Sequence, residues 1–175
     1  LSDERRTLPS IPLNRILYGP PGTGKTWSTM SEALRILDPE CPKDREEQLR
    51  CFNDFLEDGQ VKFVTFHQSF GYEDFVEGIR ATTEDQQIRY EVRDGVFKKL
   101  CAKARQDDDL PHVLIIDEIN RGNVSRIFGE LITLIEEGHR YPTPYGSTKG
   151  DRFETTLPCS GEQFSVPDNI YVIGT

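Results

Sequence analysis

The chain has 175 residues, 35% of them hydrophobic and 29% charged, which is typical of one globular domain that needs neither disulfides nor a metal to form its core. Its net charge of −9 disfavours tight duplex-DNA binding by this segment alone, and no apolar run approaches the roughly 20 residues that span a bilayer, so we expect a cytoplasmic protein without a membrane span. The four cysteines form no C-x-x-C pair, which disfavours a zinc site and favours free thiols.

The first predicted elements are a short strand over residues 15–18 and a helix over residues 27–37, after an irregular lead-in over residues 1–13. The helix is predicted from apolar residues at helical spacing, namely Met30, Ala33, Leu34 and Leu37. The segment between strand and helix fits G-x-x-x-x-G-K-[ST], the phosphate-binding loop of nucleoside triphosphatases. An ordinary glycine–proline turn is a weaker interpretation, because all four fixed positions and both flanks agree with the motif.

This glycine-rich segment supplies the candidate nucleotide-binding residues, which are Gly19, Pro20, Pro21, Gly22, Thr23, Gly24, Lys25, Thr26 and Trp27. Its glycines allow successive backbone N–H groups to point at an anion, and a helix that starts near Lys25 adds its positive end. Lys25 is expected to reach the β- and γ-phosphates, where it also supports catalysis, and the Thr26 hydroxyl is expected to bind Mg²⁺.

A second helix is predicted over residues 44–56 and a second strand over residues 61–66. The following segment, residues 66–79, is rich in aromatic residues and lies at a carboxyl strand end, where ligands bind in open α/β sheets. We interpret its aromatic residues mainly as core anchors. For His67 and Gln68 two interpretations stay open, a structural role and contact with nucleotide, water or a neighbouring subunit.

The next predicted elements are a strand or hairpin arm over residues 88–92 and a helix that begins at Val96 and reaches Ala104. Four basic residues of this helix are expected to be exposed, namely Lys98, Lys99, Lys103 and Arg105. This basic face favours contact with solvent over contact with nucleic acid.

Residues 113–116 are four consecutive apolar residues, as expected for a central strand buried on both faces. Two carboxylates, Asp117 and Glu118, follow at its carboxyl end, which is a Walker B pattern. We expect Asp117 to hold Mg²⁺, directly or through water. Glu118 is the candidate catalytic residue that orients and deprotonates the attacking water.

The rest of the chain is predicted to contain a helix over residues 124–137, a mobile loop or hairpin over residues 141–161 and a buried parallel strand over residues 170–174. Arg121 and Arg126, before and within the helix, are candidates for action across a subunit interface. Ordinary surface charges explain them equally well.

Both Walker elements and the strand after them resemble the AAA+ core, and three longer phrases resemble McrB, the motor subunit of a modification-dependent (type IV) restriction system. These phrases are residues 66–80, residues 113–131 and, less specifically, residues 164–175. The resemblance implies an α/β P-loop NTPase whose parallel sheet is sandwiched between helices in the strand order 5-1-4-3-2. It covers residues 14–175, as a partial nucleotide-binding subdomain without strand 5, the sensor after the last strand, and the helical lid.

The resemblance further implies a ring, most simply a hexamer, that hydrolyses nucleotide between subunits with Mg²⁺, and a McrC-like nuclease subunit as partner. It implies GTP as the fuel, but the chain has no Asn-Lys-x-Asp motif, so GTP and ATP both stay open. DNA is expected to bind mainly through parts outside this chain.

Because the family's arginine finger and sensor are not among these residues, we expect nucleotide binding but feeble turnover from the 175 residues alone. Two other functions compete with this interpretation. One is an ATP-driven remodeller of proteins of the MoxR or dynein type, and the other is a nucleotide-gated assembly scaffold without hydrolysis.

Overall fold

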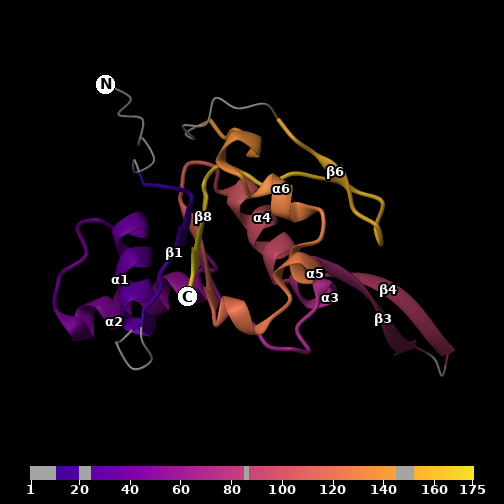
Figure 1. The fold of residues 1–175 in the computed structure, drawn as a ribbon, viewed down its shortest axis with the longest axis horizontal. Coiled ribbons are helices and arrows are strands. Elements are labelled where there is room, and N and C mark those ends of the chain that lie inside the picture. Colours follow the sequence, from indigo (N-terminus) through magenta and orange to yellow (C-terminus); the bar gives the residue numbers. More distant parts are fainter. Residues whose placement is uncertain (1–10, 20–24, 85–86, 145–151) are drawn as a thin grey trace.

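The computed structural model describes residues 11–19, 25–84, 87–144 and 152–175 (Figure 1). In the described part of the chain, one parallel sheet is formed by the strands β1 (Asn14–Ile16), β8 (Ile170–Gly174), β5 (His112–Asp117) and β2 (Val61–Thr65), in that order. These four strands correspond to strands 1, 4, 3 and 2 of the order 5-1-4-3-2 that the family resemblance implies, so the predicted order of these strands is confirmed. The predicted lead-in lies largely outside the described residues.

Helices cover both faces of the sheet (Figure 1). On one face lie α1 (Lys25–Leu37) and α2 (Arg45–Glu57); on the other lie α3 (Tyr72–Phe75), α4 (Val96–Gln106), α5 (Val124–Phe128) and α6 (Leu131–Leu134). Side chains alternate along β5, so that Val113 and Ile115 pack with α1 while Leu114 and Ile116 pack with α4. This double burial explains why the strand is apolar at four consecutive positions.

The second predicted helix is present and its start is set by Asp44. The Asp44 carboxylate accepts hydrogen bonds from the backbone N–H groups of Glu46, at 3.0 Å, and Glu47, at 3.3 Å. These groups have no partner within the helix, so the aspartate satisfies donors that the first turn leaves open.

We therefore expect Asp44→Ala to lower the free energy of unfolding by about 1 kcal/mol, the usual cost of losing such a cap. Chemical denaturation of the two proteins measures this difference. Asp54→Ala on the same helix is the matched control, because Asp54 is exposed and its side chain makes no cap. An equal loss in both variants would contradict the assigned role of Asp44.

A long antiparallel hairpin projects from the body of the molecule beside α3 (Figure 1). It consists of β3 (Glu77–Glu84) and β4 (Gln87–Asp94), so the prediction of a hairpin arm over residues 88–92 found only the second strand. A second, short hairpin pairs β6 (Thr155–Thr156) with β7 (Gln163–Phe164); β6 lies inside the predicted loop or hairpin over residues 141–161, and β7 lies just beyond it.

The predicted helix over residues 124–137 is wrong in its continuity. Gly129 adopts φ 53°, which separates α5 from α6, and the segment closes with a 3-10 turn, η2 (Glu137–His139). The apolar spacing predicted one helix because both pieces bury the same side, but only the backbone of glycine tolerates this torsion at low cost. No helix in the described part of the chain is long and apolar enough to cross a membrane.

The prediction that Lys98 is exposed is also wrong, since its side chain is 8% exposed. Its ammonium lies 2.9 Å from Glu77, 2.8 Å from Asp94 and 2.7 Å from Glu162. Glu77 is fully buried, and its other carboxylate oxygen accepts hydrogen bonds from the backbone N–H groups of Cys159 and Ser160. This network joins the base of the long hairpin, α4 and the segment between β6 and β7.

A fully buried arginine, Arg140, ties the entry of β1 to the entry of β8. Its guanidinium donates to the backbone oxygens of Ile135 and Pro167 and to the side-chain oxygen of Asn14. Burial lowers the pKa of Arg140 to about 10, which still leaves the side chain charged at neutral pH. Asn14 is the first residue of β1, so these bonds help to position the strand that leads to the glycine-rich segment.

Candidate functional site

The carboxyl ends of the four strands meet at one edge of the sheet, and their register aligns β1 with β5. Gly174 pairs with Ile16 on one side and with Ile116 on the other, so these three residues form one row. The row beyond it contains Asp117 of β5 and Leu17, the residue after β1, whose N–H donates to the Gly174 oxygen at 2.8 Å. Adjacent strands are about 4.8 Å apart, so the chain leaves β1 roughly 10 Å from the end of β5.

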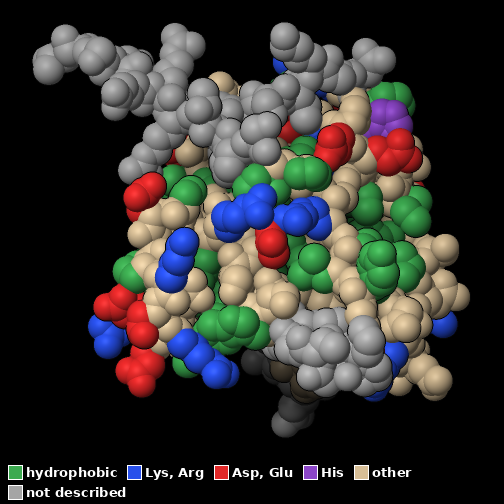
Figure 2. Space-filling model, turned by 60° about the vertical axis from the view of Figure 1, so that its left-hand side comes forward, with side chains coloured by type: hydrophobic (Ala, Val, Ile, Leu, Met, Phe, Trp, Pro, Cys, Tyr) green, Lys and Arg blue, Asp and Glu red, His purple; other side chains and the backbone are tan. Residues whose placement is uncertain are grey.

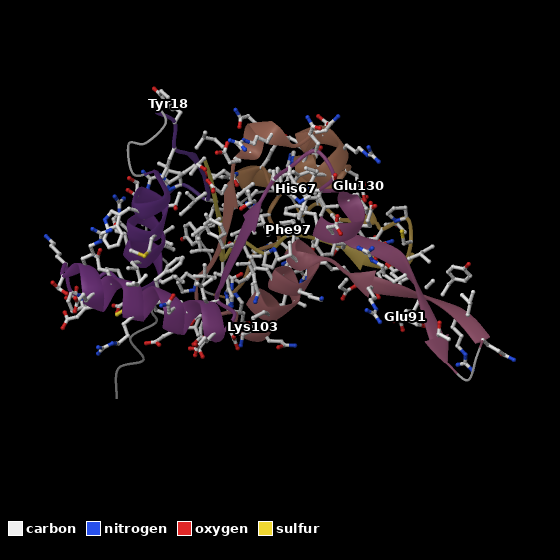
Figure 3. All side chains as sticks on the ribbon, turned by 90° about the horizontal axis from the view of Figure 1, so that it is seen from below. Tyr18, His67, Glu91, Phe97, Lys103 and Glu130 are labelled. Carbon is white, nitrogen blue, oxygen red and sulfur yellow. The ribbon has the colours of Figure 1, made fainter. Side chains whose placement is uncertain are left out.

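The chain leaves β1 through Leu17, Tyr18 and Gly19 and enters α1 at Lys25. Tyr18 is 94% exposed and points away from the core (Figure 3). The predicted binding residues Pro20, Pro21, Gly22, Thr23 and Gly24, and the side chains of Lys25 and Thr26, lie outside the described residues. Strand, glycine-rich segment and helix thus follow in the order that the phosphate-loop pattern requires, and the assigned roles stay predictions.

Trp27, the last of the predicted nucleotide-binding residues, packs on the inner side of α1. The guanidinium of Arg45 lies 4.6 Å from its ring centroid, so the indole also joins α1 to the start of α2. Figure 2, which brings the α1–α2 side of the molecule forward, shows several Lys and Arg side chains near the middle of this face with Asp and Glu side chains beside them. Positive charge is therefore available on this side despite the net charge of −9.

Asp117 ends β5 at the carboxyl edge and is held from both neighbouring strands. Its backbone oxygen accepts from the N–H of Phe66, which follows β2, at 2.9 Å. Its carboxylate accepts from the Thr175 hydroxyl, which follows β8, at 2.5 Å. The side chain is partly exposed, so a carboxylate with a fixed orientation faces the ligand side of the sheet.

Glu118 is the one non-glycine residue with a positive φ in the described part of the chain, at φ 54° and ψ 44°. This left-handed conformation costs an ordinary residue about 1–2 kcal/mol, so the surrounding contacts must hold it. The Glu118 N–H donates to the Thr175 hydroxyl at 3.3 Å, and its carboxylate lies 2.9 Å from Nε of Arg121. Because Arg121 belongs to the 3-10 turn η1 (Ile119–Arg121), the carboxylate is paired inside its own loop.

The aromatic segment after β2 has buried phenylalanines and exposed polar residues. Phe66 and Phe75 are fully buried. The Phe75 ring stacks on Phe97 and contacts Phe66 edge-on and Phe128 at a tilt, so the core interpretation of the aromatic residues is confirmed. His67 is exposed, next to Phe70 at the carboxyl edge (Figure 3). Gln68 is exposed as well, so both residues are accessible at the carboxyl edge of the sheet, where the candidate site lies.

The donor chemistry at this edge suits a hard divalent cation. A carboxylate from Asp117 and, by prediction, a hydroxyl from Thr26 are the oxygen ligands that Mg²⁺ prefers beside a phosphate. Thr175 is the residue that sequence reasoning missed. The signal available was a hydroxyl directly after the apolar strand β8, but only the sheet order shows that this strand lies beside Asp117.

Comparison with known proteins supports the same fold. The sequence model of the AAA domain (dynein-related subfamily) matches residues 14–175. The chain is 33% identical over 168 residues, 94% of its length, to the type IV methyl-directed restriction enzyme EcoKMcrB subunit of Escherichia coli (strain K12). It is 29% identical, over an alignment of 191 residues that includes the whole of this chain, to the type II restriction enzyme BsuMI component YdiS of Bacillus subtilis (strain 168). The matches cover 30% and 55% of these two relatives, and they confirm the resemblance drawn from the residue phrases.

Proposed function

Because the chain belongs to the dynein-related subfamily of AAA domains, we propose that it binds a nucleoside triphosphate with Mg²⁺ and hydrolyses it as the motor module of a McrB-like restriction complex. The observation that carries the proposal is the Asp117–Glu118 pair at the end of a buried central strand. This pair lies at the same sheet edge as the start of the glycine-rich segment.

Each residue of the candidate site has a role that follows from its position. Backbone N–H groups of residues 19–24 and the Lys25 ammonium hold the phosphates, and Thr26 and Asp117 hold Mg²⁺. Mg²⁺ supplies charge neutralisation on the phosphate oxygens. Glu118 orients a water molecule and accepts its proton, which requires its carboxylate to turn from Arg121 toward the water. Arg121 and Arg126 are exposed, which suits the proposed action across a subunit interface.

The names of the two relatives favour a function in restriction over protein remodelling, since both are described as parts of restriction enzymes. We propose a hexameric ring, GTP as fuel, a McrC-like nuclease subunit as partner and a cytoplasmic setting. The ATP-driven remodeller of the MoxR or dynein type remains the second candidate, because the matching family model is the dynein-related one. A scaffold that binds nucleotide without hydrolysis is the third.

The binding half of the proposal is tested with Lys25→Ala in the full-length protein that carries these residues. We expect saturable Mg²⁺-GTP binding in the wild type and a loss of about 1.5–3 kcal/mol in the variant, because a hydrogen bond to a charged group disappears. Calorimetric titration with GTP and with ATP measures both affinities. Lys43→Ala is the matched control, since Lys43 is an exposed lysine in the loop between α1 and α2.

Unchanged affinity in Lys25→Ala would remove the phosphate loop from its proposed role. ATP binding as tight as GTP would count against GTP as the fuel and would favour the remodeller. If the wild type binds nucleotide but does not hydrolyse it even with its nuclease partner present, the scaffold interpretation is correct.

A further inference from the structure

The strand β8 contributes a hydroxyl that contacts both carboxylate residues of the candidate site. Gly174, the last residue of β8, pairs with Ile116, so Thr175, the residue after β8, lies beside Asp117, the last residue of β5. Its N–H donates to the Ile116 oxygen at 2.9 Å, and its own oxygen accepts from the N–H of Ile119 at 2.8 Å. The backbone of Thr175 is therefore fixed on both sides of the Asp117–Glu118 pair.

The two hydrogen bonds of the hydroxyl are complementary. It donates its one proton to the Asp117 carboxylate at 2.5 Å and accepts the Glu118 N–H at 3.3 Å. The first bond limits rotation of the carboxylate, and the second holds the amide of the residue that has the left-handed backbone. An apolar side chain at this position, such as valine, offers neither bond.

We propose that Thr175 is a positioning residue for the nucleotide site, which orients the Asp117 carboxylate toward the bound Mg²⁺ and holds the Glu118 backbone in its left-handed conformation. The inference rests on the proposed function. It adds a third residue to the pair that the Walker B pattern identifies, and it acts through that pair rather than by contact with the nucleotide.

The test replaces the hydroxyl by a methyl group of the same size, Thr175→Val, in the full-length protein. Groups that hydrogen-bond to a metal-binding side chain usually contribute about 10–100-fold to metal affinity or activity. We expect the Mg²⁺ concentration for half-maximal binding of a fluorescent GTP analogue to rise by about 10–100-fold, and kcat to fall over a similar range. The melting temperature without ligand should stay within about 3 °C of the wild type.

Three matched variants make the result specific. Thr175→Ser keeps the hydroxyl and should recover most of the Mg²⁺ affinity and kcat, whereas Thr175→Ala should not. The alanine variant replaces Thr175→Val in the comparison if the valine variant does not fold. Thr83→Val removes an exposed threonine hydroxyl on β3 and should change neither quantity.

An unchanged Mg²⁺ midpoint and kcat in Thr175→Val would overturn the proposal. It would equally be overturned if serine and valine were impaired alike, or if the loss followed a matching drop in melting temperature, because both results indicate packing rather than positioning. Failure of the wild type to bind Mg²⁺-nucleotide would instead refute the proposed function, and this inference with it.

Discussion

Glu118→Gln is expected to bind Mg²⁺-nucleotide as tightly as the wild type and to hydrolyse it about 10²–10⁴ times more slowly, the range for loss of a general base. Glutamine has the shape of glutamate but cannot accept a proton from water. The left-handed backbone of Glu118 is held by the neighbouring strand, so the substitution should leave the loop in place. Single-turnover hydrolysis and equilibrium binding, measured on the full-length protein with its partner, separate the chemical step from affinity.

Glu57→Gln provides the control, since Glu57 is an exposed carboxylate at the end of α2, just before β2 begins and therefore at the edge of the sheet opposite Asp117. It should bind and hydrolyse like the wild type. Unchanged turnover in Glu118→Gln would remove this residue from its role as the base. A parallel loss of binding would instead indicate that the Glu118 carboxylate, or its ion pair with Arg121, supports the nucleotide pocket itself.

Lys98→Met is expected to lower the free energy of unfolding by about 3–5 kcal/mol, because it leaves the fully buried Glu77 carboxylate without its counter-ion. Methionine fills most of the space of the lysine stem, so the loss reports on charge rather than on a cavity. Chemical denaturation measures the difference. Lys99→Met is the matched control, because Lys99 is the next residue of α4 and is exposed.

The double variant Glu77→Gln/Lys98→Met should recover part of this stability, since it removes the uncompensated charge as well as its partner. Recovery of none of the loss would show that packing, and not the ion pair, explains the effect. The remaining cost should come from the Cys159 and Ser160 N–H groups, which would then face a neutral amide oxygen in place of a carboxylate.

The ion pair of Lys98 with Glu77 also predicts the pH range over which it stabilises the folded protein. Burial alone would raise the pKa of Glu77, but hydrogen bonds from Ser160, Lys98 and Cys159 outweigh it and lower that pKa below its ordinary value. Burial would likewise lower the pKa of Lys98, but hydrogen bonds to Asp94, Glu162 and Glu77 raise it. A lowered carboxyl pKa stabilises the fold above the unfolded value of about 4.3, and a raised lysine pKa does so below about 10.4.

The difference in stability between the wild type and Lys98→Met should therefore be largest in the pH range where Glu77 is ionised in both folded proteins, up to about pH 10. It should shrink as the pH falls through the folded pKa of Glu77, because the protonated acid no longer needs a counter-ion. A difference that stayed constant down to pH 2 would contradict the ionised pair.

The elements that the sequence predicts well are those whose signals are local. The helix α4 and the strand β5 were predicted because apolar spacing and continuous apolar runs are properties of a few adjacent residues. The hairpin strand β3 was missed because its residues are polar and glycine-containing, and only pairing with β4 makes them a strand. The break at Gly129 was missed because both helical pieces follow one apolar stripe.

By itself the sequence determined the phosphate-loop pattern, the carboxylate pair after a buried strand, and the family resemblance, because each is a fixed order of residue types along the chain. The tertiary structure decided which distant residues meet. It buried Lys98 against Glu77, placed Arg140 between the starts of two strands, and brought Thr175 beside Asp117. These contacts join residues 21, 126 and 58 positions apart. The last two form because the parallel sheet orders its strands β1-β8-β5-β2, and the first forms because the long hairpin packs beside α4; no local pattern of residues contains either arrangement.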